Sequence, residues 1–155
     1  MRKEIIFELI KKIPGISYNE IVHKTALSNG VISHYLIKLL DDKEIEKEGI
    51  IRGKYFEKNI PEKERILITI LRNKTNNEIF KLLMKDSKKN IFTANEISKK
   101  IKKSSSTISV SLKSLQKNKI VERVLMNKNT ILTNDLGYKI HNKKKWIRFF
   151  EKYNL

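Results

Sequence analysis

The chain contains no cysteine, and its 155 residues include only two prolines, five glycines and one tryptophan. The lack of cysteine excludes disulfide bonds, thiolate metal sites and cysteine nucleophiles. No apolar run approaches the length of a membrane span. Segment 1–15 is apolar over too short a run, and contains too many acidic residues, to be a secretory signal. We therefore expect a cytoplasmic protein.

The residue patterns of catalytic and cofactor sites are also missing. There is no glycine-rich phosphate loop, no Ser–His–Asp pattern and no pair of carboxylates on a common apolar face. His23 and His141 have no second histidine or carboxylate at ligand spacing. The sequence predicts that the protein is not an enzyme and holds neither a metal nor a cofactor.

Acidic side chains are scarce relative to basic ones, which number 17 and 34 and give a net charge of +17. Residues 1–60 carry 11 basic and 9 acidic side chains (+2), whereas residues 61–155 carry 23 and 8 (+15). Such a concentrated positive charge favours a polyanionic partner, with nucleic acid the first candidate and an anionic membrane surface the second. A lysine-rich surface without a partner is the alternative.

An internal repeat organises the chain. A shift of 76 residues aligns Ser17–Lys47 with Thr93–Arg123 without a gap. The identical residues, numbered in the first copy, are Asn19, Glu20, Ile21, Lys24, Ser28, Ile32, Ser33, Leu36, Leu39, Lys43 and Glu46. These identities fall on helix caps and apolar core positions, so we interpret the chain as a tandem repeat of one domain type.

Each copy predicts two short helices across a tight turn. In the second copy, Thr93 and Glu96 have the spacing of a capping box, and Ser104 caps the next helix. The apolar positions of that helix recur at steps of four and three, at Ile108, Leu112 and Leu115. Such a pair is the supersecondary unit that places a helix in the DNA major groove.

The remaining patterns predict an α+β fold, mainly α with small β-hairpin wings. Further helices are expected over 3–12, from Ser17, over 28–43, 62–72 and 77–85, and from Asp135 to about Tyr153. Strands are expected over 45–51, 54–58, 120–126 and 130–133. We predict two tandem winged helix-turn-helix domains, at 1–60 and 77–134, with a connecting helix in 61–76 and a C-terminal helix in 135–155.

The predicted recognition helices, 28–43 and 104–117, expose mainly small polar residues at their starts. Hydroxyl groups there can donate to phosphates and base edges, and helix N-termini favour anions. The residues predicted to contact DNA are Ser28, Asn29, Gly30, Ser33, His34, Lys38, Arg52, Lys54, Lys100, Lys102, Lys103, Ser104, Ser105, Ser106, Thr107, Ser109, Lys113, Arg123 and Lys128. For any one serine, a plain cap or a solvent-facing residue is the alternative.

Neither recognition helix contains arginine, the usual bidentate partner of guanine. Much of the affinity is therefore expected from lysine–phosphate contacts that depend steeply on salt. Asn29 and His34 are the candidates for direct base contacts, with groove shape supplying further specificity.

The C-terminal segment is the most aromatic part of the chain. Its apolar residues are Trp146, Ile147, Phe149, Phe150 and Tyr153. Because they cover much of the helix circumference, they suggest a partner surface, most simply for a homodimer. The alternative is that this helix folds back onto helix 62–72 of the same chain.

Segments 16–45 and 71–122 resemble the winged helix-turn-helix transcription regulators of the MarR and ArsR type, and two modules in one chain are similar to archaeal tandem winged-helix regulators. The resemblance implies a DNA-binding regulator, often dimeric through terminal helices, with recognition helices starting at Ser28 and Ser104. Metal-sensing members use cysteine-rich sites, which are absent here. Asn118 replaces the ArsR-type glycine, and asparagine is compatible with a left-handed turn.

The sequence therefore leads to one main hypothesis and two alternatives. The main hypothesis is a double-stranded DNA-binding transcriptional regulator. A nucleoid-type DNA binder with little sequence preference would also fit the excess of lysine. A winged-helix protein-interaction module would instead use the aromatic C-terminal helix.

Overall fold

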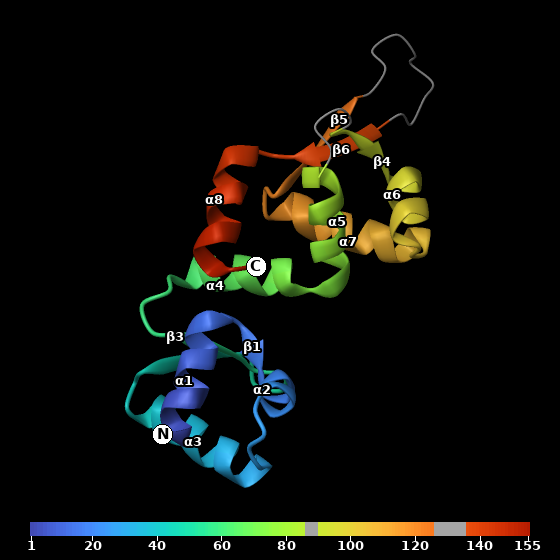
Figure 1. The fold of residues 1–155 in the computed structure, drawn as a ribbon. Helices are drawn as coiled ribbons and strands as arrows, with labels where there is room; N and C mark the ends of the chain where they lie inside the picture. The colour runs from blue at the N-terminus through green and yellow to red at the C-terminus, as the bar shows by residue number, and fades with distance from the viewer. Residues whose placement is uncertain (86–89, 126–135) are drawn as a thin grey trace. The chain divides into compact units, whose positions relative to one another are not determined.

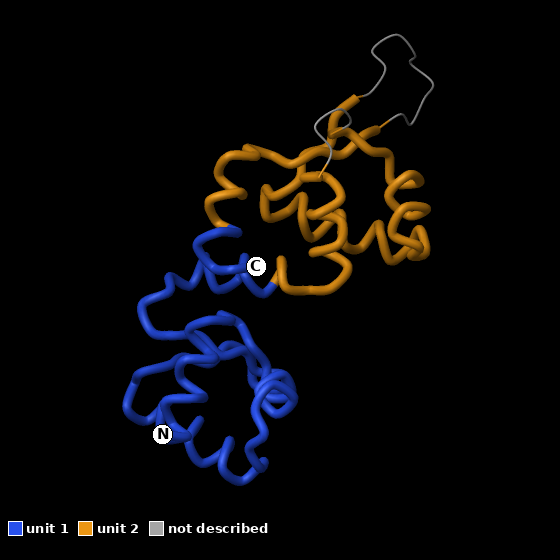
Figure 2. Tube along the Cα trace, in the orientation of Figure 1, with its two compact units in different colours: residues 1–69, 150–155 blue, residues 70–149 orange. Residues whose placement is uncertain are grey.

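In the computed structural model, residues 1–85, 90–125 and 136–155 are described, and they form an α+β fold of eight helices and six strands (Figure 1). The strands make two three-stranded antiparallel sheets. The chain divides into two compact units, residues 1–69 with 150–155 and residues 70–149 (Figure 2). None of the helices in these described segments has the length and apolarity needed to cross a membrane.

The first unit contains three helices and one sheet before the connecting helix. Its elements are α1 (Arg2–Lys12), β1 (Ile16–Ser17), α2 (Tyr18–Lys24), α3 (Asn29–Asp41), β2 (Ile45–Glu48), β3 (Lys54–Glu57) and α4 (Glu62–Arg72). The strand order is β1-β3-β2. Helix α4 continues across the unit boundary, which lies between residues 69 and 70.

The second unit repeats this order of elements. It contains α5 (Lys74–Lys85), β4 (Phe92–Thr93), α6 (Ala94–Ile101), α7 (Ser105–Lys117), β5 (Val121–Leu125), β6 (Leu136–Ile140) and most of α8 (Lys143–Tyr153). Its strand order, β4-β6-β5, is equivalent to that of the first sheet.

Strand pairing shows where the two copies differ in length. Ile16 pairs with Tyr55 in the first sheet, and Phe92 pairs with Tyr138 in the second. Ile16 and Phe92 are 76 positions apart, whereas their partners Tyr55 and Tyr138 are 83 positions apart. The second hairpin is therefore seven residues longer than the first.

The predicted helix caps are confirmed. Ser17 and Glu20 form a capping box at the start of α2, as do Thr93 and Glu96 at the start of α6. The caps of the following helices are also equivalent: the Oγ of Ser28 accepts from the amide of Val31 at 3.4 Å, and the Oγ of Ser104 accepts from that of Thr107 at 3.3 Å.

The apolar stripe found in the sequence is the core of each unit. Equivalent residues of the two copies are at most 3% exposed: Ile16, Ile21, Ile32, Leu36, Leu39 and Ile45 in the first, and Phe92, Ile97, Ile108, Leu112, Leu115 and Val121 in the second. Burying one such side chain contributes about 1.5–3 kcal/mol. This contribution explains why the repeat keeps apolar residues at these positions.

The prediction of one long helix from Asp135 is wrong. Residues 136–140 form β6, which pairs with β4 and β5, and α8 begins only at Lys143. The alternation of Leu136, Tyr138 and Ile140 is typical of a strand, and hydrogen bonding to two neighbours stabilises it. The predicted domain 77–134 therefore omits a strand of its own sheet, and the strand expected over 130–133 lies outside the described residues.

Two other element boundaries differ from the prediction. Helix α5 begins at Lys74 rather than 77, because the Oδ1 of Asn73 accepts from the amide of Asn76 at 3.1 Å and caps the helix. The strand expected over 45–51 ends at Glu48, where Gly49 has a φ of +88° and begins the hairpin loop.

The helix ends after α3 and α7 are also equivalent. The left-handed residue after α7 is Lys119 (φ 58°), whereas Asn118, which replaces the ArsR-type glycine, has a φ of −94°. Lys119 donates its amide to the carbonyl of Gln116, and Ile120 donates to that of Leu115, which is the Schellman pattern. Lys43 (φ 56°) has the same place after α3.

Candidate nucleic-acid interface

The start of α7 presents an exposed row of short polar side chains. Its exposed residues are Ser104, Ser105, Ser106, Thr107, Ser109, Val110 and Lys113. The Oγ of Ser104 lies 2.8 Å from the Oγ1 of Thr107 and 3.2 Å from the Oγ of Ser106. These hydroxyls and the helix N-terminus form a surface that can donate hydrogen bonds to an anion.

Lysines adjoin this surface directly. Lys102 and Lys103 form the turn between α6 and α7, and Lys102 caps α6 in the left-handed conformation with a φ of 61°. The side chains of Lys100, Lys102 and Lys113 are exposed, and Lys103 is half-buried. The structure thus brings together the polar and basic residues predicted for this helix.

The start of α3 is the equivalent surface of the first copy. Ser28, Asn29, Gly30, His34 and Lys38 are exposed, as predicted. Ser33 is half-buried, because its Oγ lies 3.1 Å from the hydroxyl of Tyr18, which also donates to the carbonyl of Asn29 at 3.1 Å. Since the equivalent of Tyr18 is Ala94, the second copy lacks this bridge and Ser109 is exposed.

Each of these helices also exposes one aliphatic side chain. Val110 is 70% exposed and occupies the position of His34, and Ile37 is 60% exposed and occupies the position of Lys113. Ile37 is not among the predicted contact residues. Its alignment with an exposed lysine is the signal that could have identified it.

The hairpin loop between β2 and β3 borders a hollow of about 580 Å³. Its lining residues are Ser17, Tyr18, Asn19, Lys47, Ile51, Arg52, Gly53, Lys54 and Tyr55. Arg52 is exposed and Lys54 is half-buried, so the structure brings the two predicted basic residues of the loop to one hollow. Ile50 and Ile51 are exposed at this loop, although the sequence pattern had placed them in a strand.

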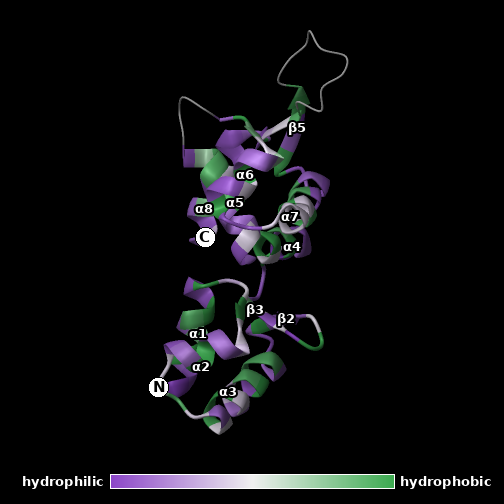
Figure 3. Ribbon diagram, turned by 90° about the vertical axis from the view of Figure 1, so that its right-hand side faces the viewer, coloured by the Kyte–Doolittle hydropathy of each residue, from purple (hydrophilic) through white to green (hydrophobic). Residues whose placement is uncertain are grey.

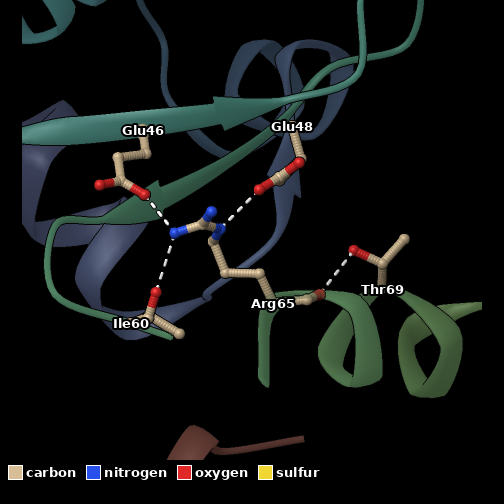
Figure 4. A network of polar contacts seen from close by, with 5 residues as sticks. All are labelled: Glu46, Glu48, Ile60, Arg65 and Thr69. Atoms are coloured by element: carbon tan, nitrogen blue, oxygen red, sulfur yellow. Dashed lines mark hydrogen bonds and ion pairs between the residues drawn. The ribbon is translucent and has the colours of Figure 1, made fainter. Parts of the chain in front are cut away.

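Arg65 of α4 binds the two carboxylates of β2 (Figure 4). Its Nε donates to Glu48 at 2.6 Å, and its Nη1 donates to the carbonyl of Ile60 at 2.9 Å and to Glu46. Because Arg65 pairs with Glu46 and Glu48, these carboxylates offset less of the positive charge of the adjoining loop.

Glu122 of β5 is equivalent to Glu46 but has different partners. Its carboxylate lies 2.7 Å from the Nδ1 of His141 and 3.2 Å from the Nζ of Lys139, both on or next to β6. These hydrogen bonds, first that of His141 and then that of Lys139, hold the pKa of Glu122 below its usual value. The structure thus gives His141 a carboxylate neighbour that sequence spacing did not show.

Only one of the two basic residues predicted for the second wing can be placed. Arg123 is exposed on β5, whereas Lys128 lies outside the described residues. Within the described ranges 1–85, 90–125 and 136–155, no three His, Cys, Asp or Glu side chains gather as metal ligands.

The aromatic residues of α8 are mostly buried within the chain. Trp146, Phe149 and Tyr153 are 1%, 8% and 7% exposed, Phe150 is half-buried and Ile147 is 38% exposed. The hydroxyl of Tyr153 donates to Glu64 of α4, as does the Nζ of Lys152 at 3.4 Å. The end of α8 therefore folds back onto the connecting helix, and the exposed apolar surface that suggested a homodimer is smaller than expected.

A search of protein-family models and a search of curated proteins found no match to this chain.

Proposed function

We propose that this protein is a double-stranded DNA-binding transcriptional regulator built from two tandem winged helix-turn-helix modules of the MarR and ArsR type. The observation that carries the proposal is the pair of equivalent helices, α3 and α7, whose cores recur position by position while their hydroxyl-rich starts stay exposed. A helix presented in this way fits the major groove, and the loop between β2 and β3, as a wing, lies on the flanking backbone.

The second module supplies most of the affinity in this proposal. Its half of the chain carries the charge of +15, and exposed Lys100 and Lys102 adjoin the start of α7. Lysine binds phosphate as a point charge and carries no base information. Binding is therefore strong at low salt and falls steeply as salt rises.

Fluorescence anisotropy with the full chain and a labelled duplex tests this function. Titrations between about 50 and 300 mM salt are expected to give a linear decrease of log K with log salt, with a slope of about −0.9 per phosphate neutralised. Affinity that does not change with salt would contradict the proposal.

The excess of lysine also favours a second candidate, a nucleoid-type binder without sequence preference. A selection from random duplexes followed by competition separates the two. A regulator binds its selected duplex about 10³-fold or more tightly than random DNA, whereas an architectural binder binds both alike.

A further inference from the structure

Two adjacent isoleucines are exposed at the tip of the β2–β3 loop. Ile50 is 95% exposed and Ile51 is 89% exposed, and they stand between Gly49 and Gly53. Part of the loop after β2 is drawn in the green of hydrophobic residues in Figure 3. A single exposed isoleucine is ordinary on a protein surface. Two neighbouring ones at a hairpin tip form an apolar projection that is almost fully exposed.

The surroundings of this tip are basic. Arg52 follows the two isoleucines and is exposed, and Lys47 and Lys54 line the same hollow as Ile51. Glu48, the nearest acidic residue in the sequence, is paired with Arg65. Apolar side chains flanked by cations suit a partner that has phosphates outside and an apolar interior, as a DNA duplex does.

The tip also shares a face with the start of α3. Tyr18 lines the hollow beside Ile51 and Arg52, and its hydroxyl contacts Asn29 and Ser33 at 3.1 Å each. A duplex that receives α3 in its major groove therefore meets the loop at the adjoining backbone and minor groove.

We propose that Ile50 and Ile51 form a wedge that enters the minor groove and partly unstacks one base step, which bends the duplex. This inference rests on the proposed DNA-binding function and adds a mechanism to it. Aliphatic side chains inserted between base pairs kink DNA toward the major groove, and the bend brings more of the duplex into contact with the protein. Pyrimidine–purine steps such as TA deform most easily and are the expected targets.

The wedge is tested with the full chain and three variants. The double variant I50S/I51S removes the apolar tip and keeps the charge, and R52A removes charge and keeps the tip. I5S is the matched control, because Ile5 is a half-exposed isoleucine (47%) on α1 of the same unit. Binding is measured by anisotropy, bending by energy transfer between the ends of a duplex of about 40 base pairs, and unstacking by permanganate reactivity of thymines.

Wild type and I5S are expected to bend the duplex and expose thymines at one step. R52A removes a predicted DNA contact and is expected to bind more weakly, but the duplex that it binds is still bent and still exposes thymines. I50S/I51S is expected to lose both signals while its affinity falls only about three- to tenfold, since phosphate contacts supply most of the binding. Bending and permanganate reactivity that persist in I50S/I51S would overturn the wedge, as would wild-type binding without bending.

Two further outcomes would show that the DNA-binding function or the type of partner is wrong. If the wild type fails to bind any duplex, the proposed function itself is refuted along with the wedge. If I50S/I51S behaves as wild type on DNA but loses binding to vesicles of phosphatidylserine and phosphatidylcholine, the isoleucines serve an anionic membrane surface, and the wedge is overturned.

Discussion

Single residues distinguish the two recognition helices of the proposed regulator. His34 and Val110 occupy equivalent exposed positions, as do Ile37 and Lys113. A histidine can hydrogen-bond a base edge, whereas an aliphatic side chain contacts the methyl group of thymine. The two modules therefore present different chemistry from the same position of one fold.

This difference predicts that Val110 reads thymine. Replacing the contacted thymine by deoxyuridine in the selected duplex removes only a methyl group and is expected to weaken binding about fourfold, the equivalent of about 0.8 kcal/mol. The V110S variant is expected to lose a similar factor and to bind both duplexes alike in an anisotropy titration. Equal sensitivity of wild type and V110S to the uracil substitution would contradict this role.

Glu122 predicts a pH dependence of stability. Its pKa is lowered in the folded protein by His141 and Lys139, so its contribution is present above the unfolded pKa and is lost as pH falls through the folded value. Its side chain is 36% exposed, so solvent screening limits the effect of E122Q at pH 7 to at most about 1 kcal/mol.

Urea unfolding between pH 7 and pH 3 measures this difference. The stability gap between wild type and E122Q is expected to close as the solution is acidified, and the exposed E151Q is the matched control. A gap that widens at low pH would refute the assignment.

At the scale of helices and strands, the ends of α3 and α7 carry a backbone cost. Lys43 and Lys119 adopt left-handed conformations in Schellman motifs, where glycine is the usual residue. A left-handed residue with a side chain costs roughly 1–2 kcal/mol. Both copies have this left-handed lysine, so both make the same backbone turn from the helix into the following strand.

Glycine at these positions is therefore expected to stabilise the protein. K43G and K119G should each raise the free energy of unfolding by about 1 kcal/mol, and the melting temperature by about 2–4 °C for a chain of this size. The control variants D41G and K117G place glycine in the last turn of the same helices and should destabilise by up to about 1 kcal/mol. Thermal unfolding followed by circular dichroism decides, and a lower melting temperature for K43G and K119G would contradict the prediction.

At the scale of the whole molecule, charge is divided unequally between the two halves, +2 and +15. We expect the charge reversal K100E/K113E to weaken DNA binding about tenfold or more and to lower the salt slope by about 0.9 for each phosphate that the variant no longer neutralises. The matched variant K24E/K38E changes the same number of exposed lysines in the first module and should weaken binding less. Equal reductions of affinity in anisotropy titrations would refute an unequal division of labour.

The sequence by itself determined the local features of this protein. Three signals predicted most of the helices and the core. They are capping pairs such as Ser17 with Glu20, the apolar stripe through Ile108 and Leu112, and the 76-residue repeat. These signals depend on residues a few positions apart, where hydrogen bonding and helical periodicity act directly.

The tertiary structure alone decided the long-range features. Residues 136–140 became a strand because β4 and β5 offer hydrogen-bonding partners distant in sequence. The aromatic residues of α8 became buried, with Tyr153 bonded to Glu64 of a helix far from it in the chain. Ile50 and Ile51 are exposed because β2 ends at Glu48, whereas the sequence pattern predicts a strand that continues to residue 51. Pairing between distant segments sets the first two outcomes, and the point where β2 stops pairing with β3 sets the third. No local pattern of residues records which partner a segment finds.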